Sequence, residues 1–395
     1  MKSIQQIVAV TLMNLRSLSQ RLGSSFVIVI GMAGVVAVLI SILAMATGAE
    51  NAMGKTGRPD RAIVIHAGAL SELLSNLPRQ AALAIGDAPG LAKAKNGEAV
   101  LSAESIVLVE MKQKSGLSSN VSVRGVGSRH LLLRPEVKLV EGRAFQPGLR
   151  ELMAGKSAQA IYGGLAVGSQ TMLNGQAWTV VGVFESNGDA RESEVLADNE
   201  TLMAAFHRDT FQSVSVQLRS AESFAEFRDF LTSNPQLSVS VARETDYYAE
   251  QSKPFASTLS FVAYLVGGIM AVGAFFGAIN SMYSAVSVRT VEIATLRAIG
   301  FRSTPIVVSI FIESLLLALL GAALGAALAA LVYSGHTINT NGGGVARSQY
   351  LFAMTVTSGQ VQLAMIWACV VGIAGALPPA LRAARMPVVA ALRGG

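Results

Sequence analysis

FVIVIGMAGVVAVLISILAMAT, residues 26–47, is a run of 22 residues without a charged side chain. Roughly 20 apolar residues in a helix cross the ~30 Å hydrocarbon core of a bilayer, so this stretch predicts a spanning helix. Residues 255–288, 303–346 and 348–381 have the same character, with Glu313 as their only charged residue. The chain is 51% hydrophobic and 14% charged, whereas soluble proteins average about 25% charged. We therefore expect an integral membrane protein with four transmembrane helices.

The first span also has a feature of a secretory signal peptide. Ala44-Met45-Ala46 is a small-residue pattern of the kind that precedes a cleavage site. Signal peptides, however, have an apolar core of about 7–15 residues, shorter than this run. We expect an uncleaved signal anchor.

The distribution of lysine and arginine predicts the orientation, because short cytoplasmic segments carry an excess of both. The loop 334–358 holds only Arg347, and residues 48–254 carry 21 basic against 23 acidic residues. The net charge of +6 thus reflects topology, and no nucleic-acid partner is expected. Both termini and the 289–302 loop should be cytoplasmic in a bacterial inner membrane, with the large domain in the periplasm. The basic residues outside that domain that indicate this are Lys2, Arg16, Arg21, Arg289, Arg297, Arg302, Arg382, Arg385 and Arg393.

The expected fold is α-helical in the membrane, with a large extracytoplasmic α+β domain inserted between the first and second spans. In chain order we expect an amphipathic cytoplasmic helix (1–24), span one (25–48), the periplasmic domain (49–254), span two with a stalk extension (255–287), a cytoplasmic helix (288–304), span three (305–333), a short periplasmic loop (334–358), span four (359–382) and a cytoplasmic tail (383–395).

The first 22 residues predict a helix lying on the cytoplasmic leaflet. Ser3, Gln6, Asn14, Arg16 and Arg21 fall largely outside its apolar stripe. Apolar residues recur in it at spacings of three and four, namely Ile4, Val8, Leu12, Leu15, Leu18 and Leu22.

The periplasmic domain should have two α+β lobes and no disulfide, because the single cysteine, Cys369, lies in span four. Alternation and β-branched runs predict strands, and 3.6-residue patterns predict helices. The predicted strands are within 100–113, 120–126, 177–186, 211–220 and 236–243, and the predicted helices are within 71–87, 199–209 and 221–234.

No motif marks this chain as an enzyme. AENAMGKT, residues 49–56, matches a relaxed phosphate-loop pattern, but it follows a spanning helix rather than a strand and faces away from cytoplasmic ATP. The four histidines are scattered without metal-ligand spacing. We expect no catalytic, cofactor-binding or metal site within the chain.

Two features of the spans favour helix packing or a buried function. GAFFG (Gly273, Gly277) and GAALG (Gly321, Gly325) are small-xxx-small pairs that allow close helix contact in lipid. Glu313 lies about eight residues into span three. An ionisable group at that depth is a functional candidate; the alternative is a structural pair with a cytoplasmic arginine such as Arg302.

RTVEIATLRAIGFR, residues 289–302, predicts a short charged helix between spans two and three. Arg289 and Glu292 are three apart and could pair weakly. Gly300 suits the end of the helix and Pro305 the start of span three. Its shallow stripe of small residues favours docking into a partner's groove, against the alternative of a solvated loop. That stripe consists of Val291, Ala294, Thr295 and Ala298.

INSMYSAVSVRTVEIATLRAIGF (279–301) resembles the signature of the MacB/FtsX/LolC-type (type VII) ABC transporter permeases. The resemblance extends to their third span, in FIESLLLALLGAALGAALA (311–329), and to their tail, in PPALRAARMPVVAALRGG (378–395). It also includes strands of their periplasmic domain, in KLVEGRAFQPG and WTVVGVFES. Ala294 departs from the glycine common after Glu-Ile. The residues that carry the signature are Asn280, Arg289, Thr290, Glu292, Ile293, Leu296, Arg297, Ala298 and Gly300.

The resemblance implies a permease subunit without its own ATPase domain. Such a subunit pairs with a second permease copy, identical or similar, and with two copies of an ABC ATPase that uses ATP and Mg²⁺. The 289–302 helix would be the coupling helix, and ATP hydrolysis would move the periplasmic domains (mechanotransmission). The work implied is efflux or extraction of a hydrophobic or periplasmic substrate, with a membrane-fusion adaptor and an outer-membrane duct as further partners. Two alternatives remain open: an FtsX-like transducer that controls a periplasmic hydrolase, and a receptor without an ATPase.

Overall fold

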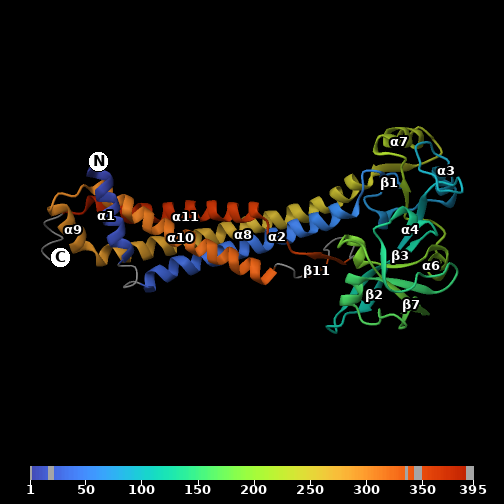
Figure 1. The fold of residues 1–395 in the computed structure, drawn as a ribbon, viewed down its shortest axis with the longest axis horizontal. Helices are drawn as coiled ribbons and strands as arrows, with labels where there is room; N and C mark the ends of the chain where they lie inside the picture. The colour runs from blue at the N-terminus through green and yellow to red at the C-terminus, as the bar shows by residue number, and fades with distance from the viewer. Residues whose placement is uncertain (1, 17–21, 334–336, 342–348, 388–395) are drawn as a thin grey trace. The chain divides into compact units, whose positions relative to one another are not determined.

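The computed structural model describes residues 2–16, 22–333, 337–341 and 349–387 and divides into two units (Figure 1). The helical unit comprises residues 1–47, 257–336 and 354–395, and the sheet unit comprises residues 48–256 and 337–353. Arg21, His336, Arg347 and the end of the predicted tail, including Arg393, lie outside the described residues.

Within the described residues, four helices are long and apolar enough to cross a membrane, as the sequence predicted: α2, α8, α10 and α11. They pack on one another around small and aliphatic side chains such as Leu39, Ala318 and Ala368, all fully buried. Helices α10 and α11 lie side by side (Figure 1). The helices of this unit are α1 (Lys2–Arg16), α2 (Leu22–Thr56), α8 (Glu244–Val288), α9 (Thr290–Ala298), α10 (Ser303–Tyr333) and α11 (Ser358–Arg385).

The outer faces of these helices remain apolar. Phe261 and Ile269 on α8 and Leu331 on α10 are exposed to 66%, 65% and 82%. Water would penalise such a surface, whereas hydrocarbon does not. This pattern fits helices that are covered by lipid or by another membrane subunit.

The glycines of α10 allow it to approach α2 closely. A Cβ added to Gly321 would lie 2.5 Å from the carbonyl oxygen of Val29, and one added to Gly325 would lie 2.4 Å from that of Ala33. On α8 the situation differs, since a Cβ on Gly277 would be in ordinary contact with Val27, at 3.8 Å, and one on Gly273 would meet nothing in the described chain.

Helix α1 packs against α10. Ile4, Val8 and Leu12 of the predicted apolar stripe are exposed, while Val10 and Asn14 are buried. The stripe is therefore free to face the bilayer surface, and Asn14, which the sequence places outside the stripe, is buried.

The sheet unit is built on one mixed ten-stranded sheet, with strand order β10-β1-β9-β2-β3-β8-β5-β7-β4 and β6 paired with β7. The β3–β8 and β5–β7 pairs are parallel and the other pairs are antiparallel. The strands are β1 (Arg61–His66), β2 (Leu101–Lys112), β3 (Ser118–Val126), β4 (Lys138–Gly142), β5 (Glu151–Gly155), β6 (Gln170–Leu173), β7 (Gln176–Glu185), β8 (Val195–Asp198), β9 (Ser213–Gln217) and β10 (Val239–Arg243).

Short helices cover this sheet. The continuous helix predicted over 71–87 is wrong, because Pro78 has extended backbone and begins a new helix after the turn η2. The helical elements are η2 (Glu72–Leu74), α3 (Arg79–Gly86), α4 (His130–Leu133), α5 (Lys156–Ile161), η3 (Ala190–Ser193), α6 (Asn199–Ala205), η4 (Ala221–Ser223) and α7 (Phe224–Thr232).

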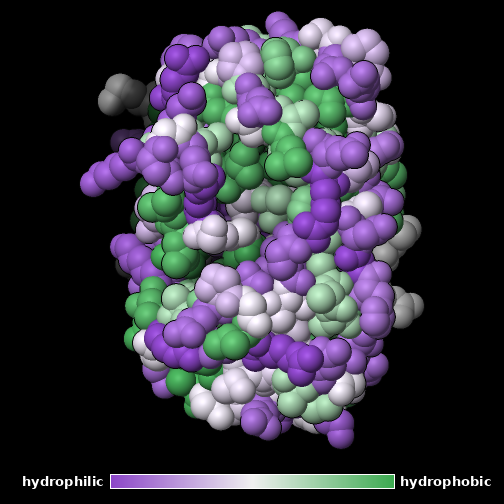
Figure 2. Space-filling model, turned by 90° about the vertical axis from the view of Figure 1, so that its right-hand side faces the viewer, coloured by the Kyte–Doolittle hydropathy of each residue, from purple (hydrophilic) through white to green (hydrophobic). Residues whose placement is uncertain are grey.

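The two lobes share strand β2. Its residues 101–104 pair with β9 and its residues 105–112 pair with β3, so the lobe boundary falls between Glu104 and Ser105. One lobe has a core around Phe227, under α3 and α7; the other has a core around Trp178. Hydrophilic and hydrophobic residues alternate over the face drawn in Figure 2.

Three connections from membrane helices belong to the sheet unit. These are the end of α2 (48–56), the start of α8 (244–256) and a hairpin between α10 and α11. The hairpin consists of β11 (Thr337–Asn341) and β12 (Gln349–Ala353), within the segment that the sequence treated as a simple loop. Helix α8 thus begins earlier than the predicted span two and has 45 residues.

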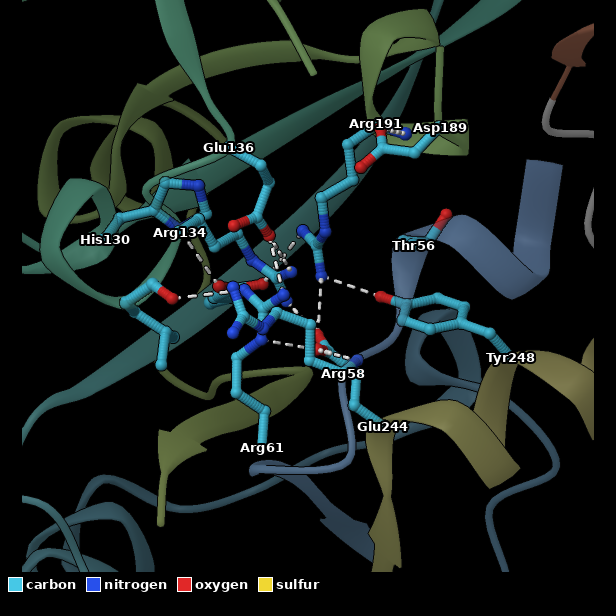
Figure 3. A network of polar contacts seen from close by, with 12 residues as sticks. Thr56, Arg58, Arg61, His130, Arg134, Glu136, Asp189, Arg191, Glu244 and Tyr248 are labelled. Carbon is cyan, nitrogen blue, oxygen red and sulfur yellow. Dashed lines mark hydrogen bonds and ion pairs between the residues drawn. The ribbon is translucent and has the colours of Figure 1, made fainter. Parts of the chain in front are cut away.

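Where these connections enter the sheet unit, the fold buries many charges (Figure 3). Arg124 on β3 binds both oxygens of Glu194, at 2.7 and 2.8 Å, and also contacts Glu72 at 2.7 Å and Glu104 at 2.8 Å. Because an unpaired buried charge is very costly, these groups fix one another's positions. The buried ionic residues of this cluster are Arg61, Glu72, Glu104, Arg124, His130, Arg134, Asp189, Arg191, Glu194 and Glu244.

The first residue of α8, Glu244, binds the neighbouring part of this cluster. Its carboxylate lies 2.9 Å from the Arg61 guanidinium and is ion-paired with Arg134. Arg61 also pairs with Glu136 at 2.6 Å. The start of α8 is therefore held to strand β1 by charge.

Burial and pairing shift several pKa values in opposite directions. Burial raises the pKa of Asp189 to about 6, against a hydrogen bond from Ser186 and the charge of Arg191. Burial also acts on Glu194 and Glu104, but Arg124 and Arg191 respectively overcome it and hold the pKa of each glutamate below its usual range.

The glycine contacts predict unequal tolerance of a methyl group. We expect Gly325→Ala to destabilise the chain by about 1–3 kcal/mol, since the new Cβ would meet the backbone of α2. Gly273→Ala is the matched control and should leave stability unchanged or slightly higher. Thermal unfolding in detergent measures both, and equal losses in the two variants would contradict the close contact of α10 with α2.

The raised pKa of Asp189 predicts a pH dependence. Because the folded-state pKa, about 6, exceeds the unfolded value, the contribution of this carboxyl to stability is complete below about pH 4 and is lost as the pH rises through 6. Between pH 5 and 7.5, where Glu104 and Glu194 stay ionised, wild type should therefore lose about 1.4 kcal/mol relative to Asp189→Asn, the rest of the loss having occurred below pH 5. Unfolding midpoints of the full chain across this range test this, with the exposed Asp229→Asn as control; parallel curves would contradict it.

Candidate functional site

Helix α9 connects α8 to α10 and contains most of the residues that the sequence assigned to the coupling helix. Gly300 follows the helix with φ +100°, a backbone conformation that favours glycine. The Gly300 amide donates to the Arg297 carbonyl at 3.2 Å, and the Phe301 amide donates to that of Leu296 at 3.0 Å. This pair of bonds is the Schellman arrangement that ends helices, as expected from the sequence.

Arg289 stands just before α9 and pairs with Glu313 on α10. Its Nη1 lies 3.1 Å from the Glu313 carboxylate, and both side chains are 5% exposed. The predicted pairing of Arg289 with Glu292 is replaced by this ion pair, and Glu292 is exposed. Glu313 thus has an arginine partner, as one of the two hypotheses held, but the partner is Arg289 rather than Arg302.

Helix α1 contributes to the same cluster. The Asn14 carbonyl accepts from Nη2 of Arg289 at 3.3 Å, and the Asn14 side-chain amide donates to the hydroxyl of Ser309. Asn14 and Ser309 are both buried. The sequence placed Asn14 outside the apolar stripe of α1 but gave it no role, and it did not single out Ser309.

Two further contacts hold α9 against the helical unit. Ile293 belongs to the core of this unit and Ala294 is buried beside it. Nη1 of Arg297 donates to the carbonyls of Ala384 and Met386, at 3.3 and 2.5 Å, at the end of α11. A cation at a helix C-terminus satisfies carbonyls that have no partner within the helix.

The opposite face of α9 is exposed. Val291 and Ile299 are exposed to 57% and 69%, and Glu292, Thr295 and Ala298 lie with them on the surface. An exposed short helix with two aliphatic side chains and small residues between them is a surface that a groove of another protein could bind.

The other candidate residues make different contacts or lie on other elements. Thr290 caps the end of α8, its hydroxyl donating to the Ser287 carbonyl at 2.7 Å. Asn280 is exposed on α8. Leu296 is partly buried. Residues 49–56, the relaxed phosphate-loop match, lie in the helical end of α2.

Two family models match the chain. Residues 25–233 match the MacB-like periplasmic core domain, and residues 264–388 match the FtsX-like permease C-terminal domain. One curated relative, the macrolide export ATP-binding/permease protein MacB of Nitrobacter winogradskyi, is 26% identical over 265 residues. That match covers 62% of this chain and 38% of the relative's length.

Two solved structures match about half of this chain. The periplasmic region of MacB from Actinobacillus actinomycetemcomitans is 13% identical with a TM-score of 0.37, covering 49% of this chain and 92% of that one. The extracellular domain of the noncanonic ABC-type transporter YknZ from Gram-positive bacteria is 16% identical with a TM-score of 0.35, covering 46% and 99%. The family models cover most of the sheet unit, most of the membrane helices and α9, and by them the chain belongs to the MacB/FtsX-type family of ABC transporter permeases.

Proposed function

We propose that this protein is the permease subunit of an ABC transporter, with α9 as the helix that a separate ATPase subunit binds. The observation that carries the proposal is the contrast between the two faces of α9. One face is held by the Arg289–Glu313 pair, Ile293 and Arg297, while the other presents Val291 and Ile299 to the surroundings.

This contrast suits the transfer of force. A helix that was itself mobile would absorb the motion of a bound partner. An anchored helix passes that motion to the elements that hold it, here α1, α10 and α11. Under this proposal ATP and Mg²⁺ are used by the partner ATPase, in two copies, on the cytoplasmic side of a bacterial inner membrane.

The chain would act as a pair with a second permease copy, identical or similar, and move its periplasmic domain to export or extract a hydrophobic or periplasmic substrate. The match to a MacB-like core domain supports this role. A membrane-fusion adaptor and an outer-membrane duct would be further partners.

The match to the FtsX-like permease domain favours a second candidate, a transducer that controls a periplasmic hydrolase without transport. Both roles need the same ATPase contact at α9. Proteins that co-purify with the chain separate them, because an adaptor indicates transport and a cell-wall hydrolase indicates signalling.

The exposed face of α9 gives the first test. Val291→Glu and Ala298→Glu place a charge on the proposed contact without touching the Arg289–Glu313 pair. We expect each to weaken ATPase binding at least tenfold, measured by co-purification and by ATP hydrolysis in reconstituted membranes, with an unchanged unfolding temperature. Gln5→Glu, exposed on α1, is the control, and normal binding in both α9 variants would overturn the assignment.

The buried pair gives the second test. Removing one partner leaves a charge buried, so Arg289→Met or Glu313→Leu alone should cost roughly 3 kcal/mol or more of stability. The double variant should be more stable than either single variant, because no unpaired charge remains. Unfolding in detergent measures this, and additive losses would show that the two side chains act independently.

A further inference from the structure

The three connections from membrane helices into the sheet unit end on one short element, η3 (Ala190–Ser193). At the end of α2, the buried Thr56 hydroxyl accepts from the Ala190 amide at 3.1 Å. At the start of α8, the Tyr248 hydroxyl accepts from Nη2 of Arg191 at 2.7 Å. Strand β12 of the hairpin between α10 and α11 lies against the same element. Thr56, Arg191 and Tyr248 are shown together in Figure 3.

Element η3 is in turn fixed to the sheet. A Cβ on Gly155, at the end of β5, would lie 2.1 Å from the carbonyl oxygen of Glu192, so η3 approaches this strand too closely for any side chain. The Gly155 amide donates to the Glu194 carbonyl at 2.9 Å. Nη1 of Arg191 lies 3.5 Å from the Glu104 carboxylate on β2, at the boundary of the two lobes.

Within η3, the polar groups leave little freedom. The Asp189 side chain accepts from the Arg191 amide at 2.9 Å and from the Ser186 hydroxyl at 2.7 Å. Arg191 is 2% exposed, and its guanidinium also lies 3.8 Å from Glu194 and 4.0 Å from Glu244. A displacement of η3 relative to either side would break charge-assisted hydrogen bonds in a buried site.

We propose that η3 is the joint at which α2, α8 and the β11–β12 hairpin act on the two sheet lobes, with Thr56, Arg191 and Tyr248 as its positioning residues. The proposal rests on the proposed function, since the joint transmits the motion that ATP hydrolysis would produce. It assigns to the hydrogen bonds of η3 a role in coupling as well as in stability.

The test uses single hydroxyl deletions in the full chain. Tyr248→Phe removes the acceptor for Arg191 and keeps the ring that lies beneath the guanidinium, 5.9 Å from it. Thr56→Val removes the acceptor for Ala190, and Thr56→Ser restores it. The matched control is Tyr247→Phe, whose hydroxyl accepts instead from the Glu72 amide of η2 at 2.8 Å.

Amide hydrogen exchange of the reconstituted chain with its ATPase gives the coupling readout. In Tyr248→Phe and Thr56→Val, we expect the ATP-dependent change in exchange over the sheet unit to fall at least fivefold, while ATP hydrolysis stays within twofold of wild type. Thr56→Ser and Tyr247→Phe should behave as wild type. The proposal would be overturned if both test variants showed the wild-type ATP-dependent change in exchange, or if Tyr247→Phe reduced that change as much as they do.

The same measurement separates this inference from the proposed function. If wild type shows no ATP-dependent change in amide exchange, the proposed function fails. The role of η3 as a joint is then tested by amide exchange in the chain without nucleotide. In that case Tyr248→Phe and Thr56→Val should speed exchange of the amides of 189–194 at least threefold, and Tyr247→Phe should not. Unchanged exchange there would show that η3 does not depend on these contacts.

Discussion

The cost of burying an unpaired charge constrains both units of this protein. An isolated ionised group loses far more solvation than any single contact returns, so a buried arginine persists only where carboxylates or carbonyls surround it. In the helical unit, Glu313 satisfies this requirement for Arg289. In the sheet unit, Glu72, Glu104 and Glu194 together satisfy it for Arg124. Each of these pairs joins two different elements of the chain, and each therefore fixes where those elements meet.

Buried ion pairs from these two clusters lie at the two ends of helix α8. Arg289 lies where α8 ends and α9 begins, and Glu244 lies where α8 starts. One helix thus has a buried ion pair just beyond its last residue and another at its first residue. Along α8 between these two ends, the side chains are mainly apolar and depend on packing. Charge therefore determines the two ends of the helix and hydrophobic contact determines its middle.

Local features were predictable from the sequence and distant partnerships were not. The four apolar helices and the Gly300 stop depend on runs of neighbouring residues, and the structure has them. The interruption at Pro78 was missed because the apolar pattern continues across it, although a proline is a local signal. The pairing of Arg289 with Glu313, 24 residues away, and its contact with Asn14, 275 residues away, depend on how helices pack. A single sequence shows that Arg289 is charged but does not show which residue pairs with it.

Buried ionic contacts and apolar contacts respond differently to a load. Aliphatic side chains that slide by an ångström exchange one set of dispersion contacts for another of similar energy. A guanidinium that is hydrogen-bonded to several oxygens can keep all of these bonds in only a few positions. If it moves away, each buried group that loses its partner contributes its full desolvation cost. Arg191 contacts oxygens from β2 and from α8, and its neighbour Ala190 binds α2. A displacement of α2 or α8 at this point is therefore less costly if η3 moves with the helices than if it stays behind. On this argument the polar character of the joint matters as much as its position, because an apolar contact of the same size would let the helices slip.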